Sequence, residues 1–276
     1  MTEVQGYARL CLGEVPHYIR ETRLSSGNAE VRISPIGATV TSWRIGENNI
    51  ITPPKVHIDP NQTKDIYRGG IPILFPIAGT PSNDSLSRRL NQHGFARDLL
   101  WQVSEIDQDS KEKNNATFRL TSDVNSKDAY PFDFEILNKI TLLERSLRYD
   151  VQVRNTGDDR PMPYVLGFHP YFSLDSKDTT GITTTVPGFE TNPEILRNSI
   201  IVDAPSEQST FTIPGKGKFT LKYSNEFRRL IIWTDNPGYI CFEPWTSGPK
   251  TIDTDESLRA HIGETKNLFF EISLES

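Results

Sequence analysis

The amino-acid sequence predicts an all-β protein, a large antiparallel β-sandwich, and three observations support this fold class. Segments in which apolar and polar residues alternate with a period of two occur along most of the chain. Turn-forming residues separate many of these segments. No segment shows the apolar spacing of an amphipathic helix longer than two turns. The 276 residues carry no linker-like composition, so we expect a single domain spanning residues 1–276, as in many all-β proteins of this length.

In the first part of the chain, the strand patterns place apolar side chains on one face. They cover residues 31–33, 38–45, 116–120, 132–136, 140–142 and 147–153. Residues 144–146 lie between two of these segments and predict a hairpin connection. The turn-forming residues 155–158 end the last segment.

The second part of the chain continues the β pattern. Strands are expected at residues 219–223, 230–233, 239–242 and 267–274, with a strong turn at residues 234–238. Residues 256–262 are the one segment expected to form a short helix. The irregular segments 52–92 and 173–210 are the places to look for function, because loops on a rigid sheet often carry chemistry.

Charge and cysteine content exclude several classes of partner and structure. The net charge is −6 and no basic run is present, which argues against nucleic acid or an anionic membrane as a partner. Two cysteines, Cys11 and Cys241, do not make a disulfide framework. No apolar stretch approaches the roughly 20 residues that cross a bilayer, and no secretory signal is visible. We therefore expect a soluble protein in the cytoplasm.

One ionisable residue, His169, lies in the apolar run of residues 164–172. Pro170 follows it directly, so the chain is extended here and no helix can continue through. Burial would lower the pKa of this imidazole, and a nearby carboxylate would raise it again. The alternative is a core histidine whose ring nitrogens are satisfied by backbone groups.

Two polar motifs precede it in the chain. Arg68 is followed by Gly69 and Gly70, which let the backbone approach a ligand closely, and its guanidinium can bind hydroxyls or anionic oxygens. The alternative is a structural arginine at a tight turn. In the second motif, residues 91–97, extended geometry would put His93 and Arg97 on one face, a suitable surface for sugar hydroxyls or a phosphate. The alternative is a surface turn with a solvated histidine.

Glu243 ends the apolar run 239–242 and precedes Pro244 and Trp245. A glutamate is seldom buried without a partner, so this position indicates a functional carboxylate; the alternative is a strand end that faces water. The sequence has no His-x-His, no histidine pair at helical spacing and no cysteine pair, so no local metal-ligand cluster is predicted. A metal site built from His93, His169 and Glu243 would draw on three distant strands. We expect neither a metal nor a cofactor.

Together, the motifs at residues 68–72, 92–97, 168–172 and 243–245 resemble the galactose mutarotase-like family, which contains the aldose 1-epimerases and their hexose-6-phosphate relatives. The resemblance implies a many-stranded antiparallel supersandwich. It implies that Glu243 is the general base at the anomeric hydroxyl and that His169 is the general acid at the ring oxygen. It also implies that His93 is a second, assisting histidine. Arg68, Gln92 and Arg97 are implied to contact the substrate. Family members use a further aspartate for sugar hydroxyls; Asp203 lies in the right region but in no recognisable motif, and it is left out of the site.

Three functions follow from the resemblance, each with a small-molecule sugar as the partner. The first is an aldose 1-epimerase acting on a free hexose. The second is a mutarotase for a hexose 6-phosphate, since Arg68 and Arg97 could bracket a phosphate. The third is a carbohydrate-binding protein without turnover, against which the presence of both Glu243 and His169 speaks.

Overall fold

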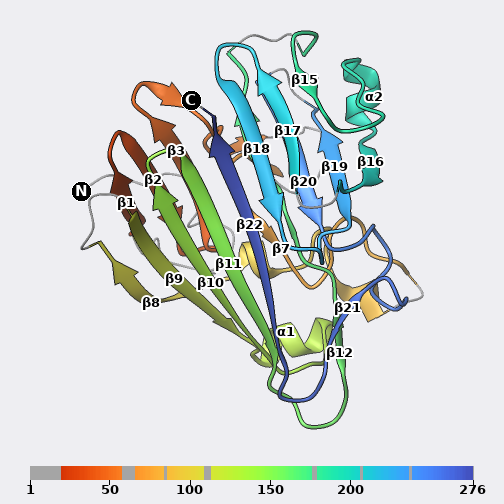
Figure 1. Ribbon diagram of the computed structural model, residues 1–276. Helices are drawn as coiled ribbons and strands as arrows, with labels where there is room; N and C mark the ends of the chain where they lie inside the picture. Colours follow the sequence, from red (N-terminus) through yellow and green to blue (C-terminus); the bar gives the residue numbers. More distant parts are fainter. Residues whose placement is uncertain are drawn as a thin grey trace.

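The computed structural model describes residues 20–57, 66–83, 86–108, 113–175, 179–205, 208–235 and 238–275. These residues form several antiparallel sheets, of which the largest is a fan of long strands (Figure 1). That eight-stranded sheet contains, in spatial order, β15 (Thr183–Thr184), β17 (Gln208–Ile213), β18 (Gly217–Tyr223), β22 (Thr265–Leu274), β11 (Ser146–Asn155), β10 (Phe134–Leu143), β9 (Lys113–Thr121) and β8 (Gln102–Asp107).

A second sheet of six strands carries the residues of greatest interest. Its order is β16 (Ile200–Asp203), β19 (Arg229–Trp233), β20 (Tyr239–Trp245), β13 (Gly167–Phe168) and β7 (Ile73–Leu74), and β14 (Tyr171–Ser173) also pairs with β20. Strands β13 and β14 both lie along β20, with the short link 169–170 between them. The link is therefore held against the middle of the sheet.

Smaller sheets and short helices complete the described structure. A four-stranded sheet contains β1 (Thr22–Ser26), β2 (Ala29–Ser34), β3 (Thr39–Ile45) and β4 (Asn48–Asn49). Two-stranded sheets are formed by β5 (Lys55–His57) with β6 (Ile66–Arg68), and by β12 (Met162–Tyr164) with β21 (Leu258–Ala260). The helices are α1 (Val124–Ala129), α2 (Pro193–Arg197) and two 3-10 turns, Leu86–Arg89 and Ala96–Asp98.

The all-β prediction is confirmed, and the predicted strands fall within or overlap the observed ones. The short helix expected at 256–262 is wrong: β21 occupies its centre and pairs with β12, because these residues complete a sheet rather than stand alone. The two irregular segments also hold short strands and α2. Cys11 and part of the turn at 234–238, residues 236–237, lie outside the described residues.

Aromatic rings join the eight-stranded sheet to the six-stranded sheet. Phe172 of β14 lies 4.9 Å from Phe211 of β17 and 5.4 Å from Phe219 of β18, measured between ring centroids. Phe168 of β13 lies 5.0 Å from Phe270 of β22. Burial of each such ring stabilises the fold by about 1.5–3 kcal/mol. The alternating strands thus turn one face toward a shared core.

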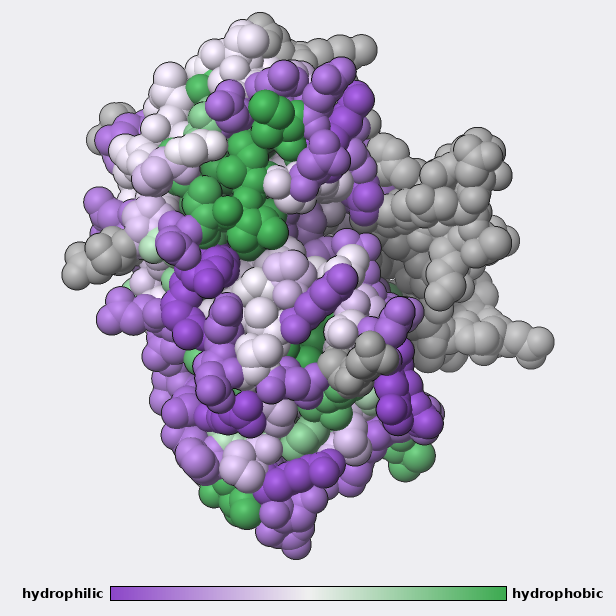
Figure 2. All heavy atoms as spheres, turned by 90° about the vertical axis from the view of Figure 1, so that its right-hand side faces the viewer, coloured by the Kyte–Doolittle hydropathy of each residue, from purple (hydrophilic) through white to green (hydrophobic). Residues whose placement is uncertain are grey.

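Apolar surface is gathered on the upper part of the face that carries α2 and β16 (Figure 2). Ile195 of α2 is 40% exposed and Ile201 of β16 is 47% exposed. Among the described residues, no helix is long and apolar enough to span a membrane.

Candidate active site

Glu243 lies inside strand β20, not at its end. Every residue of β20 is buried, and Glu243 is only 1% exposed. The strand is flanked by β19, where Ile231 is its register partner, and by the β13–β14 segment on the other side. The alternative of a strand end facing water is therefore wrong: the carboxylate is held in the interior.

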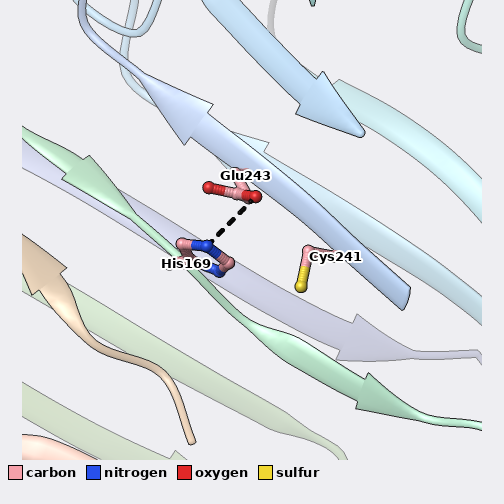
Figure 3. Close-up of side chains that lie close together, drawn as sticks. All are labelled: His169, Cys241 and Glu243. Carbon is pink, nitrogen blue, oxygen red and sulfur yellow. Dashed lines mark ion pairs between the residues drawn. The ribbon is translucent and has the colours of Figure 1, made fainter. Parts of the chain in front are cut away.

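His169 occupies the link between β13 and β14. Its backbone N–H donates to the carbonyl of Pro72 at 3.0 Å, which anchors the link to the strand on the far side. The imidazole stacks on the ring of Tyr171, with centroids 4.5 Å apart and an interplanar angle of 6°. Its Nε2 atom lies 3.4 Å from Oε1 of Glu243 (Figure 3). Two residues that lie 74 positions apart in the chain thus form one buried pair.

His93 reaches the same place from a turn. Its φ angle is +68°, and that of Gly94 is +73°. A Cβ atom on Gly94 would lie 2.1 Å from the carbonyl oxygen of Phe75, so only glycine allows this close approach. The prediction that residues 93–97 are extended is therefore wrong: they form a left-handed turn followed by the 3-10 turn Ala96–Asp98.

Gly79 fixes both the position and the tautomer of His93. The backbone N–H of Gly79 donates to Nδ1 of His93 at 3.0 Å, and the backbone N–H of His93 donates to the carbonyl of Gly79 at 2.8 Å. Because Nδ1 accepts, the neutral ring carries its proton on Nε2. The ring lies edge-on to His169, with centroids 5.5 Å apart. His93 thus supplies a hydrogen-bond donor beside the buried pair.

Burial governs the protonation of these three groups. It raises the pKa of Glu243 well above its ordinary 4.5, and the indole N–H of Trp245, followed by the guanidiniums of Arg68 and Arg97, opposes this rise. It lowers the pKa of His169 and of His93 well below 6.5, helped by the same positive charges. The expected upward push on the His169 pKa from a carboxylate is not observed: desolvation of the imidazolium is the largest effect, and burial favours the uncharged form of Glu243 as well.

Three buried polar atoms around the pair have no hydrogen-bond partner among the described residues. They are Oε2 of Glu243, Nδ1 of His169 and Nε1 of Trp245. Buried polar atoms are almost always hydrogen-bonded, so these three atoms need polar partners that the described side chains do not supply, such as water molecules or the hydroxyl groups of a ligand. The free atoms comprise an acceptor, an indole donor and an imidazole nitrogen that can do either.

The predicted substrate contacts lie in different environments. The guanidinium of Arg68 is 5.0 Å from the ring of Trp233, which meets His169 edge-on. Arg97 donates to the backbone carbonyl of Gln92 at 3.1 Å, and its side chain is 28% exposed. The side chain of Gln92 is exposed, so this residue contributes its carbonyl to the position of Arg97.

Cys241 lies two residues before Glu243 on β20, beside His169 (Figure 3). Ligand atoms of these three residues all lie within 4.8 Å of one another. A thiolate, an imidazole and a carboxylate are the ligands of a zinc-like cation, but burial raises the pKa of this thiol and keeps it protonated. The sequence pattern indicated only an apolar strand position for Cys241.

Asp203 and Asp235 differ in their relation to the site. Asp203 is exposed on β16 and pairs with Arg229 at 2.7 Å, in a surface hollow with Tyr223 and Phe227. Asp235, which sequence reasoning assigned only to a turn, pairs with Arg68 at 3.1 Å. The sequence signal for it is a carboxylate two residues after Trp233, the last residue of an apolar strand.

The fold is that of a galactose mutarotase-like protein, as the motifs implied. A solved structure of a galactose mutarotase-like protein from Lactobacillus casei is 21% identical, covers 93% of this chain and all of its own, and superposes with a TM-score of 0.73. The family model for aldose 1-epimerase matches residues 20–252. This chain therefore belongs to the aldose 1-epimerase family, a family of isomerases.

Two other relatives match most of this chain, and a third matches about half of it. The structure of the Slr1438 protein from Synechocystis sp. PCC 6803 is 26% identical, covers 96% of this chain and 99% of its own, and gives a TM-score of 0.79. The plasmid-encoded protein LacX of Lactococcus lactis is 23% identical over 77% of this chain and 85% of its own length. A protein from Cenchrus ciliaris, provisionally named a glucose-6-phosphate 1-epimerase, is 33% identical over 49% of this chain and 41% of its own length.

Proposed function

We propose that this protein interconverts the α and β anomers of a hexose, with Glu243 as general base, His169 as general acid and His93 as a hydrogen-bond donor to the sugar. The observation that carries the proposal is the buried contact of 3.4 Å between Glu243 and His169, together with their unpartnered atoms Oε2 and Nδ1.

The reaction needs two proton transfers at one carbon atom. Opening a cyclic hemiacetal removes a proton from the anomeric hydroxyl and delivers one to the ring oxygen, and both oxygens are bonded to C1. An acid and a base that lie side by side therefore suit the reaction. After rotation about the C1–C2 bond the aldehyde is attacked from its other face, and the same two groups return the protons in reversed roles.

His93 supports the charge that develops during ring opening. Its neutral ring is held by Gly79 with the proton on Nε2, so it donates a hydrogen bond without competing for the transferred proton. Donors held in position in a dry site stabilise developing negative charge more strongly than water does. The chemistry requires neither a metal nor a redox cofactor.

A hexose 6-phosphate is the second candidate substrate. Two guanidiniums, Arg68 and Arg97, act on the pKa of Glu243 and thus lie near the pair. Arginine binds phosphate through a planar fork of donors. The provisional name of the Cenchrus ciliaris relative agrees with such a substrate.

Polarimetry tests the proposal. Freshly dissolved α-D-glucose or α-D-galactose relaxes toward anomeric equilibrium, and the native protein is expected to accelerate this relaxation in proportion to its concentration. The same protein after heat unfolding is the control. Sugar binding without acceleration would contradict the proposal and favour a non-catalytic carbohydrate-binding protein.

A further inference from the structure

The Arg68–Asp235 pair is held more firmly than an ordinary surface ion pair. Both Nε and Nη2 of Arg68 donate to Oδ2 of Asp235, at 3.2 and 3.1 Å. The hydroxyl of Tyr239 donates to Oδ1. Both carboxylate oxygens are therefore occupied, and the carboxylate is fixed against the guanidinium by partners from two directions.

This carboxylate belongs to the wall of the candidate active site. Arg68 lies over Trp233, which meets the imidazole of His169 edge-on at 5.6 Å. On the other side, Tyr239 lies 4.9 Å from Tyr171, the ring on which His169 stacks. Asp235 is thus linked to the proposed general acid by two series of contacts, one through Arg68 and Trp233 and the other through Tyr239 and Tyr171.

Asp235 changes what Arg68 can bind. A hexose 6-phosphate carries nearly two negative charges at neutral pH. A phosphate bound to Arg68 would lie within a few ångströms of the Asp235 carboxylate and would be repelled by it. Arg97 is the other guanidinium near the pair, and it already donates to the carbonyl of Gln92. Asp235 thus compensates the charge of Arg68, and Asp98, whose Oδ1 lies 3.9 Å from Nε of Arg97, partly compensates the other guanidinium.

We propose that Asp235 is a specificity-determining residue that excludes phosphorylated sugars, so that the substrate is an uncharged hexose. The inference rests on the proposed function and names its substrate class. A fixed carboxylate and guanidinium side by side can accept from and donate to the hydroxyls of a neutral sugar. The same carboxylate acts against an anionic competitor, since specificity often depends on a repulsive element.

Asp235→Asn tests this assignment, because it removes the charge and keeps the shape. Asp203→Asn is the matched control: Asp203 is also an aspartate paired with an arginine, but it lies outside the site, and its side chain is 89% exposed against 38% for Asp235. Exchange NMR at anomeric equilibrium gives kcat/KM for glucose and for glucose 6-phosphate without pure anomers.

The native protein is expected to prefer glucose. Asp235→Asn should shift the ratio of the two kcat/KM values toward glucose 6-phosphate by about tenfold or more, since like charges placed side by side are strongly unfavourable. Asp203→Asn should leave the ratio unchanged. A native preference for glucose 6-phosphate, or an unchanged ratio in Asp235→Asn, would overturn the proposal.

Two further measurements keep the test decisive. If Asp235→Asn does not fold, the inhibition of native glucose turnover by glucose 6-phosphate is measured instead. An inhibition constant well above the KM for glucose supports the proposal, and an inhibition constant below that KM overturns it. If the native protein turns over neither sugar, the proposed function fails instead. Titration calorimetry of the two sugars with the native protein and with Asp235→Asn then measures the same selectivity as a ratio of dissociation constants.

Discussion

Glu243 and His169 are unusual because burial opposes the charged form of each. The carboxylate has its pKa raised and the imidazole has its pKa lowered, so the pair holds a single proton over the pH range between the two values. These directions favour that proton on Glu243 in the free protein, whereas the proposed roles need it on His169, so it must pass across their 3.4 Å contact before the ring opens. Strongly perturbed groups in contact are typical of catalytic sites.

The pH dependence of kcat/KM follows from these directions. Below the lowered pKa of His169 the pair gains a second proton and loses its base, so the acid limb is expected below pH 6.5. Above the raised pKa of Glu243 the pair loses its last proton, so the alkaline limb is displaced upward from pH 4.5. A rate profile measured from pH 4 to pH 10 checks this, and an acid limb at or above pH 6.5 would contradict the account.

At the scale of elements, the contact between β13 and β20 sets the position of the site. Gly167 of β13 is the register partner of Trp245 on β20. A Cβ atom on Gly167 would lie 2.6 Å from Cδ1 of the Trp245 ring. That ring lies edge-on to His93, with centroids 5.7 Å apart. Glycine at this position therefore lets the two strands bring the tryptophan beside the histidines.

Gly167→Ala should damage activity more than stability. The added methyl group displaces the Trp245 ring, which costs about 1–3 kcal/mol of unfolding free energy, as overpacking in a core usually does. Because Trp245 lies beside the histidines and Glu243, its displacement shifts these residues as well. The kcat value should therefore fall by more than the loss of folded protein explains. Gly248→Ala is the control, because its methyl group would meet Cγ2 of Thr251 at 4.0 Å, an ordinary contact. Equal losses in both variants would argue against a positioning role for this contact.

Elements that are half-buried could be predicted from the sequence, and others could not. Strand β22 alternates between buried and outward-facing residues over most of its length, so its period is visible. Strands β13 and β14 are only two and three residues long, too short to show a period. The turn at His93 was missed because a positive φ is uncommon for a residue other than glycine.

At the scale of the whole molecule, the sheet brings distant segments to one place. Arg68, His93, His169 and Glu243 were selected from the sequence by their polar chemistry in apolar surroundings and by a family resemblance, and the structure places the last three in contact. Asp235 and Cys241 were not selected. Their relation to the pair depends on the pairing of β19, β14 and β20, which no local pattern reveals.

The same antiparallel scaffold holds the Glu243 carboxylate in place. β20 is covered on both sides by neighbouring strands and is buried throughout. A side chain on such a strand has little freedom to leave its position when its charge changes. Glu243→Gln should therefore leave the fold intact, because glutamine keeps the shape of the side chain and removes only its ability to accept a proton.

Comparing Glu243→Gln with the native protein in the mutarotation of α-D-glucose is the most direct test of the proton-passing pair. We expect Glu243→Gln to lower the catalysed rate by about 10²–10⁴-fold, the usual contribution of one general base. Its circular dichroism spectrum and its sugar binding should be retained. A Glu243→Gln variant that turns over glucose as fast as the native protein would contradict this prediction.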